Sequence, residues 1–174
     1  MERLWAGWRT AYVASAAASD ADGPDASASP FTAILASGLP DEETHILWRG
    51  RRCFAILNAF PYTSGHLMVM PYREVGELED LEPDEHAELW QGVTSAVQAL
   101  KKAYQPDGIN LGMNLGRPAG AGIPAHLHVH VLPRWNGDTN FMTTVAEVRV
   151  IPETLSSSAA KIRAAWPGSV DTDG

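Results

Sequence analysis

The segment HLHVHV, residues 126–131, alternates strictly between histidine and an aliphatic residue. Successive side chains of a β-strand point to opposite faces, so this pattern predicts a strand with His126, His128 and His130 on one face. The aliphatic side chains between them would pack against a core, which leaves the histidine face available for polar chemistry. The chain is therefore expected to contain a sheet with one apolar face and one functional face.

Three explanations of this histidine row can be compared. Neighbours on one face of a strand lie roughly 6.6 Å apart and the outer pair roughly 13 Å apart, so one zinc ion with bonds of about 2.1 Å cannot contact all three histidines. Cys53 is the only cysteine, so the thiolate ligands that zinc often uses are scarce. Histidines that merely lie on a solvated surface would rarely place three of the chain's six within five residues. We therefore expect no metal site and favour a catalytic or anion-binding row, because neutral imidazole is nucleophilic and exchanges protons with phosphate oxygens near pH 7.

Composition limits the class of protein. The chain of 174 residues, with 45% hydrophobic and 20% charged residues, suits one globular domain with a core. A net charge of −8 without a basic stripe disfavours a nucleic-acid duplex as partner, whereas a small anion can still bind at a local positive site. No apolar run reaches the ~18 residues of a membrane span, and the single cysteine excludes an internal disulfide. We expect a cytoplasmic protein that does not associate with membranes.

Four parts are expected along the chain. Residues 1–13 carry apolar side chains at four-residue spacing, which predicts a helical arm that docks on the domain or on a second subunit. Residues 14–30 are rich in Ala, Ser and Asp and are expected to form a disordered linker. The folded domain would then occupy residues 31–166, and residues 167–174 would form a flexible tail.

Within the domain, β-rich runs surround one long helical pattern. Pro83 suits a first helical turn and Lys101 a last one, which predicts a helix over 83–104. Pro133 is expected to end the histidine strand, because proline cannot donate a hydrogen bond. Short connections between the strands imply an α+β fold: an antiparallel sheet of about five strands with one long helix and a C-terminal helix. The expected strands are 44–48, 53–57, 66–71, 109–115 and 126–132, and the last helix is expected over 152–166.

A glycine-rich stretch, GRPAGAG at 116–122, leads into the histidine strand. Glycines allow backbone N–H groups to form a concave anion-binding nest and allow a phosphate to approach closely. Taken alone, such a loop can equally be an ordinary connection. Beside three histidines it favours a phosphate site with an adjacent nucleophile. No Walker lysine motif or dinucleotide-binding fingerprint is present in the sequence, so histidine would carry the phosphate chemistry.

Together these segments resemble the histidine triad (HIT) superfamily of nucleotide hydrolases and transferases. HLHVHVL matches its signature of three histidines alternating with apolar residues, and NAFPYTSGHLMVMPYR is similar to its segment with Asn or Asp eight residues before a histidine, here Asn58 and His66. PFTAI is similar to the segment that lines its base pocket. Within the superfamily, PYTSGHLMVMPYREVGELEDL and HLHVHVLPRWNGDTNF are most similar to the actinobacterial diadenosine tetraphosphate phosphorylase branch. The resemblance implies a HIT-like fold.

The resemblance also implies a role for each matching residue. His128 would attack the α-phosphorus and carry the nucleotidyl group, and His126 would orient it largely through its backbone carbonyl. His130 and His66 would lie against the phosphates and assist charge and proton transfer. The implied substrate-binding residues are Asn58 for the ribose hydroxyls; Asn114 with the backbone of Gly120, Ala121 and Gly122 for the phosphates; Phe31 and Ile34 for the base; and Trp135 for the polyphosphate or second nucleoside, with simple packing as an equal alternative.

The implied reaction is cleavage of diadenosine polyphosphates such as diadenosine tetraphosphate (Ap4A) at the α-phosphate, through a nucleotidyl-histidine intermediate. Phosphate as acceptor makes the enzyme a phosphorylase that releases ADP, and water makes it a hydrolase. This sequence has Ala121-Gly122 where Gly-Ser is expected in the phosphorylase branch, so it lacks a hydroxyl that could bind the incoming phosphate. The sequence therefore does not decide between phosphate and water as the acceptor. Ile123 replaces a hydroxyl residue that phosphoramidase relatives often carry. The alternatives are a purine nucleoside phosphoramidase or another HIT dinucleotide hydrolase and, from a different class, a non-catalytic nucleotide-binding regulatory module.

The resemblance extends to partners and cofactors. Many relatives carry two cysteines near PFTAI for a structural zinc, which this sequence lacks, so no such site is expected. No cofactor is required, although Mg2+ can accompany the substrate polyphosphate. The expected ligands are diadenosine polyphosphate, AMP, ADP and ATP. A homodimer is expected, formed through the long helix and the sheet edge, with a tetramer through the N-terminal arm as the alternative.

Overall fold

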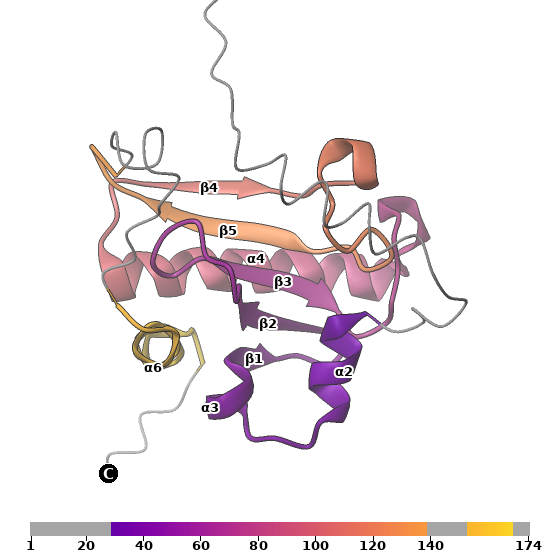
Figure 1. The fold of residues 1–174 in the computed structure, drawn as a ribbon, viewed down its shortest axis with the longest axis horizontal. Coiled ribbons are helices and arrows are strands. Elements are labelled where there is room, and N and C mark those ends of the chain that lie inside the picture. The colour runs from indigo at the N-terminus through magenta and orange to yellow at the C-terminus, as the bar shows by residue number, and fades with distance from the viewer. Residues whose placement is uncertain (1–28, 139–152, 169–174) are drawn as a thin grey trace, which may run out of the picture.

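A computed structural model describes residues 29–138 and 153–168 of the chain. In these residues five strands form one sheet in the order β1-β2-β3-β5-β4, and every neighbouring pair is antiparallel (Figure 1). Strand β5 inserts between β3 and β4, although β4 precedes it in sequence. The predicted α+β fold with an antiparallel sheet is confirmed. The strands are β1 (Ile46–Arg49), β2 (Cys53–Leu57), β3 (Leu67–Pro71), β4 (Gly108–Gly112) and β5 (Val129–Arg134).

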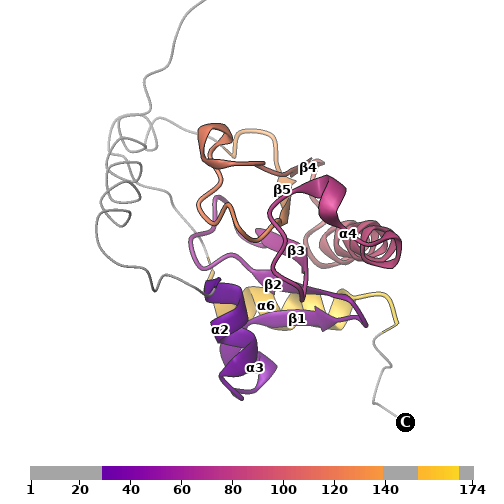
Figure 2. The same ribbon diagram turned by 90° about the vertical axis from the view of Figure 1, so that its right-hand side faces the viewer.

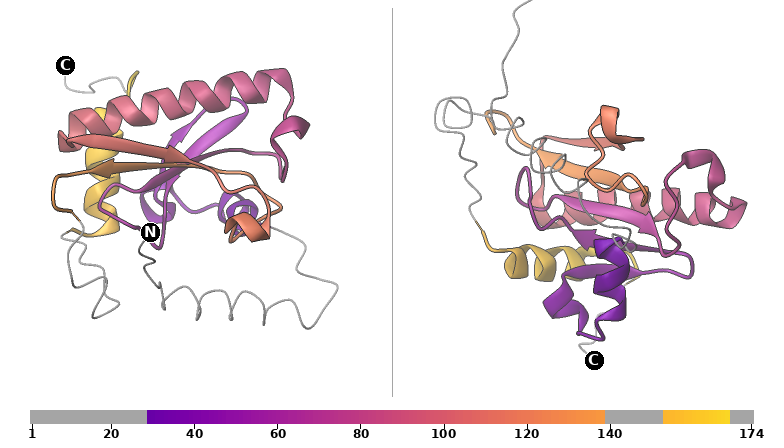
Figure 3. Two further views of the ribbon diagram at one scale, coloured as in Figure 1. Left: turned by 90° about the horizontal axis from the view of Figure 1, so that it is seen from above. Right: turned by 45° about the vertical axis from the view of Figure 1, so that its right-hand side comes forward.

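Helix α4 (Pro83–Tyr104) lies along one face of this sheet, as the view from above in Figure 3 shows. Its predicted bounds are confirmed. The helix begins with a capping box in which the Glu85 carboxylate accepts a hydrogen bond from the Glu82 N–H, at 3.0 Å. The same carboxylate lies 2.7 Å from the Arg73 guanidinium, which connects the start of α4 to the segment after β3.

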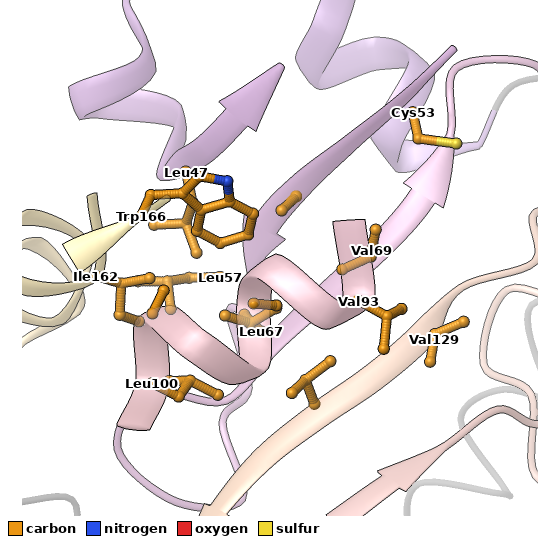
Figure 4. Close-up of a cluster of buried hydrophobic side chains, with 14 of the residues drawn as sticks. Leu47, Cys53, Leu57, Leu67, Val69, Val93, Leu100, Val129, Ile162 and Trp166 are labelled. Carbon is orange, nitrogen blue, oxygen red and sulfur yellow. The ribbon is translucent and has the colours of Figure 1, made fainter. Parts of the chain in front are cut away.

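The main core lies between the sheet and α4 (Figure 4). Alternation along each strand directs every second side chain to this face, so Leu67 and Val69 of β3 and Val129 and Val131 of β5 pack beneath the helix. Helix α6 (Leu155–Ala165) and the following Trp166 close this core beside β1 and α4 (Figure 2).

The opposite face of the sheet is covered in part by α2 (Pro30–Ala36). Phe31 of this helix packs with Phe54 of β2 and Met68 of β3 in a second buried cluster. Both faces of β2 and β3 are therefore covered, and all ten of their residues are buried. The remaining elements are α3 (Asp41–Thr44) and two short 3-10 helices, η1 (Leu78–Asp80) and η2 (Arg117–Ala119).

The bounds of the histidine strand differ from the prediction at both ends. Strand β5 begins only at Val129, and it continues through Pro133 to Arg134. The expectation that Pro133 ends the strand is wrong. Pro133 pairs with Ile109 of β4, whereas β3 pairs with β5 only as far as Val131. Among the residues that the structure describes, β5 pairs beyond Val131 with β4 alone, and a residue without an N–H is tolerated at such an edge position.

Other boundaries differ by a few residues. Ser29 and Pro30, assigned to the disordered linker, belong to the domain, because Ser29 is the N-cap of α2 and Pro30 is its first residue. The last helix begins at Leu155 after a Thr154 cap, and β4 ends at Gly112. The predicted arm, the linker as far as residue 28, Pro152 and the tail from residue 169 lie outside the described residues.

Candidate active site

The three histidines of the triad enter the site from the start of β5 and the extended segment before it. Their side chains point away from α4, because the intervening Leu127 and Val129 belong to the core beneath that helix. His126 and His128 are buried and His130 is half-buried. The strict alternation therefore holds on both sides of the strand's first residue, and the predicted division into an apolar face and a histidine face is confirmed.

His128 is held in one tautomer. Its Nδ1 lies 2.8 Å from the backbone oxygen of His126, and a carbonyl can only accept, so Nδ1 carries the proton. In the neutral ring Nε2 is then unprotonated and nucleophilic. Burial lowers the pKa of His128 below its ordinary 6.5, which keeps the ring neutral at pH 7.

His126 is fixed by hydrogen bonds at both ring nitrogens. Nε2 lies 2.8 Å from the Pro71 carbonyl oxygen and must donate to it. Nδ1 therefore accepts from the Ser29 hydroxyl, at 2.9 Å. Burial lowers the pKa of His126, so this neutral arrangement persists at pH 7. The ring joins the end of β3 to the start of α2, and it thereby immobilises the carbonyl that orients His128.

His66 and His130 form a second ordered pair. The backbone N–H of Tyr62 donates to Nδ1 of His66 at 3.1 Å, so the proton of a neutral His66 lies on Nε2. That Nε2 is 2.9 Å from Nδ1 of His130, which accepts and carries its own proton on Nε2. Burial, followed by the nearby His128, lowers the pKa of His130 to about 4. A neutral His130 thus offers a fixed N–H donor next to the nucleophile.

The glycine-rich loop is fastened to the residues around it. The Asn114 side-chain amide donates to the Gly120 carbonyl at 3.3 Å, and Gly120 has φ 98°, a left-handed conformation that favours glycine. The His126 N–H donates to the Ile123 carbonyl at 3.3 Å, which ties the loop to the histidine segment. Ala121 is buried and Gly122 is exposed. The loop that was expected to bind phosphate therefore leads directly into the triad.

The family follows from comparison with known proteins. The model of the HIT domain family matches residues 40–137, more than half of the chain. The chain belongs to the HIT family. This HIT protein is 43% identical to the AP-4-A phosphorylase of Mycobacterium tuberculosis over 167 residues, which are 95% of this chain and 85% of that protein. The resemblance to the superfamily and to its phosphorylase branch is confirmed.

Two further relatives of the HIT protein are informative. The asymmetrical bis(5'-nucleosyl)-tetraphosphatase of Schizosaccharomyces pombe is 34% identical over 95 residues, 55% of this chain and 52% of that protein. The solved structure of a histidine triad nucleotide-binding protein from Sulfolobus tokodaii superposes with a TM-score of 0.65 at 28% identity, covering 79% of this chain and 91% of that one. Sequence and fold thus agree on the family.

The structure brings most of the predicted site residues of this HIT protein together. The Phe31 ring lies edge-on to His126 and His128, with centroid distances of 5.4 and 5.6 Å. Ile34 packs against the cluster that contains Phe31. The Asn58 amide is next to His66, with Nδ2 3.5 Å from Nε2, while its Oδ1 accepts from the Phe60 N–H. The residues proposed to bind base and ribose therefore flank the histidines.

Trp135 lies apart from this group. It follows the far end of β5, about 16 Å along the strand from His130 at the usual rise per residue, and its ring packs edge-on against Tyr104 at 6.1 Å. This contact favours the packing alternative for Trp135. Conversely, Ser29 and Tyr62 contact the histidines although neither was singled out in the sequence. The position of Tyr62 inside NAFPYTSGH, four residues before His66, was the available signal.

Two other properties of the HIT protein bear on its chemistry. Cys53 is buried on the α4 side, and burial raises the pKa of its thiol to about 12, which leaves it unreactive. In residues 29–138 and 153–168 no three His, Cys, Asp or Glu side chains gather in a metal-binding arrangement. The helices in those residues are too short or too polar to cross a membrane.

Proposed function

We propose that this HIT protein is an enzyme that cleaves dinucleoside polyphosphates such as Ap4A by transferring a nucleotidyl group to His128. The observation that carries the proposal is the hydrogen bond from His128 Nδ1 to the His126 carbonyl, which leaves Nε2 as the nucleophile. The identity to AP-4-A phosphorylase over 95% of the chain supports the choice of substrate.

In the first step Nε2 of His128 attacks an α-phosphorus and forms an N–P bond. The bond from this phosphorus to the bridging oxygen breaks. That oxygen leaves with the remaining phosphates and the second nucleoside of the substrate, which is ATP when the substrate is Ap4A. The Nε2–H of His130 is suited to donate to phosphate oxygens, and His66 holds this donor in place. Backbone N–H groups of residues 120–122 and the Asn114 amide are proposed to bind the remaining oxygens.

The acceptor in the second step decides between two reactions. An oxygen of inorganic phosphate attacks the same phosphorus, breaks the N–P bond and releases ADP, whereas water releases AMP. The 43% identity to a named phosphorylase favours phosphate. The absence of a hydroxyl at Ala121-Gly122 favours water as the second candidate, because a side chain that could hold the incoming phosphate is missing.

The test is product analysis. The protein is incubated with Ap4A in the presence and absence of inorganic phosphate, and the nucleotides are separated by anion-exchange chromatography. ADP with ATP, formed only when phosphate is present, supports the phosphorylase. AMP with ATP in both conditions supports the hydrolase, and no product from Ap4A would refute the proposal in favour of a phosphoramidase or a binding module.

We also propose a cytoplasmic homodimer that needs no protein-bound cofactor, with Mg2+ accompanying only the polyphosphate. Strand β4 ends the sheet formed by the described residues, and Leu111 on it and Leu115 just after it are exposed at 51% and 38%. An exposed strand edge with apolar side chains favours pairing with a second copy. Light scattering of the purified protein tests the dimer, and turnover in EDTA tests the need for Mg2+.

A further inference from the structure

The aromatic and imidazole rings of the site form one continuous row across the sheet face. Phe31 contacts His128 at a centroid distance of 5.6 Å, His128 contacts His130 at 4.9 Å, and His130 contacts His66 at 5.1 Å. The row ends at Tyr62, whose ring lies 4.6 Å from that of His66. An aromatic side chain, Phe31 or Tyr62, therefore lies at each end of the row. His128, His130 and His66 lie between these two rings.

The two ends of the row differ in exposure. Phe31 is 6% exposed and belongs to the cluster under α2, whereas Tyr62 is 50% exposed. Phe60, two residues earlier in the same β2–β3 loop, is 84% exposed and is the most exposed large apolar side chain of the described residues. In Figure 1 this loop precedes β3 at the opposite end of the strand from α2. The Tyr62 ring thus lies at the end of the row away from Phe31, and Phe60 belongs to the same loop.

Hydrogen bonds hold the backbone of this loop in place. The Asn58 side chain accepts from the Phe60 N–H at 2.9 Å, and the Tyr62 N–H donates to His66 at 3.1 Å. Backbone bonds from the Asn58 N–H to the His66 carbonyl and from the His66 N–H to the Thr63 carbonyl close the loop. A rigid loop that presents aromatic rings to solvent loses little conformational entropy when a planar ligand stacks on it.

We propose that Tyr62 and Phe60 form a second nucleoside subsite, which stacks the base of the leaving nucleotide. The inference rests on the proposed function, since it assigns the far half of the same substrate. A dinucleoside polyphosphate has a base at each end of an anionic chain, and the ring row has an aromatic group at each end of a set of phosphate-facing histidines. Stacking on exposed rings tolerates any base, so the subsite selects for two nucleosides and not for one particular base.

The experiment measures binding, and it therefore does not depend on turnover. Isothermal titration calorimetry is carried out on His128→Ala, which cannot form the intermediate, with Ap4A and with adenosine 5'-tetraphosphate, which has four phosphates but one nucleoside. Adding Phe60→Ala or Tyr62→Ala is expected to weaken Ap4A binding about tenfold, the loss typical of one stacked base, and to change binding of the one-nucleoside ligand less than about twofold. Tyr62→Phe keeps the ring and is expected to retain the affinity.

Control variants distinguish stacking of the second base from positioning of His66 and from a base site at Trp135. Leu39→Ala removes a different exposed side chain, 52% exposed between α2 and α3, and is expected to change neither affinity. Equal weakening of both ligands by Tyr62→Ala would overturn the inference, because Tyr62 would then act by positioning His66. A loss confined to Trp135→Ala would also overturn it and place the second base at the far end of β5. If the binding difference is found but Ap4A is not turned over by the unmutated protein, the subsite stands and the proposed function fails.

Discussion

The Ser29 hydroxyl lies 2.9 Å from Nδ1 of His126, a residue 97 positions further along the chain, and donates a hydrogen bond to it. The same oxygen accepts from the Phe31 N–H at 3.2 Å and caps α2. The Ser29 N–H in turn donates to the Glu74 carboxylate at 3.3 Å. One small side chain therefore links the helix that carries Phe31 to the histidine whose carbonyl orients the nucleophile.

Replacing this hydroxyl is expected to affect both stability and turnover. Ser29→Ala removes the helix cap and leaves His126 Nδ1 without its donor, which is expected to cost about 1–3 kcal/mol of unfolding free energy. It should also lower kcat more than it raises KM, because a less fixed His126 carbonyl orients His128 poorly. Urea unfolding and steady-state kinetics measure the two effects. Ser29→Thr keeps the hydroxyl and serves as the control; equal behaviour of the two variants would contradict this account.

Removing the nucleophile is expected to abolish chemistry without unfolding the protein. His128→Ala should lower kcat by roughly three orders of magnitude or more, because no other group can carry the nucleotidyl group. Rapid quenching followed by intact-mass spectrometry under non-acidic conditions should detect the nucleotidylated chain in the unmutated protein only. The matched control is His86→Ala, an exposed histidine on α4, which should behave like the unmutated protein. An adduct on His128→Ala would assign the nucleophile to another residue.

The pH dependence of turnover follows from burial of the histidines. Burial lowers the pKa of His128 below 6.5, so its nucleophilic neutral form persists as the pH falls through that value. We expect the acid limb of the kcat/KM profile to lie below pH 6.5. A profile measured from pH 4.5 to 9 decides this, and an acid limb at or above the ordinary value would contradict it.

The free energy of unfolding is also expected to decrease as the pH falls. The pKa of His130 is about 4 in the folded protein and ordinarily 6.5, so the unfolded chain binds more protons between these values. The contribution of this neutral histidine is complete above pH 6.5 and is lost as the pH falls toward 4. Urea unfolding at pH 7 and pH 5 should show a smaller decrease for His130→Asn than for the unmutated protein. Equal decreases would show that His130 does not contribute.

The acceptor can be tested by restoring a hydroxyl to the glycine-rich loop. Gly122 is exposed and does not have a positive φ, so its backbone can accept a serine. Gly122→Ser adds a donor beside the proposed phosphate site, and we expect it to lower the KM for inorganic phosphate and to raise the ratio of ADP to AMP. The same ratio is measured for Gly122→Ala as a control. An unchanged ratio in the serine variant would remove this loop position from acceptor choice.

Local patterns predicted the elements whose signals are local. The bounds of β2 and α4 are confirmed because β2 is one uninterrupted apolar run and α4 carries end signals at both termini. The placement of β5 between β3 and β4 depends on pairing between distant residues, which alternation alone does not reveal. The resemblance to a family placed His66 and His130, 64 positions apart, against the same phosphates, but it did not predict their direct contact.

Two contacts of the site were missed for physical reasons. Ser29 lies in a segment rich in Ala, Ser and Asp, where composition predicts disorder, yet one tertiary hydrogen bond gives it a fixed place. Tyr62 orients His66 through its backbone N–H, a group that every residue except proline possesses, so its side chain gives no sign of this contact and only its position inside NAFPYTSGH could have indicated it. Side-chain patterns reveal functional groups better than they reveal the backbone groups that position them.

The alternation along β5 also separates the residues that maintain the fold from the residues that carry the chemistry. Val129 and Val131 maintain the core beneath α4, whereas His128 and His130 face the site. A descendant of this chain can therefore exchange a reactive side chain, and so alter or lose turnover, while it still folds. Substitutions of the core residues act differently. Small changes in packing shift the strand and so change the position of the nucleophile without replacing it.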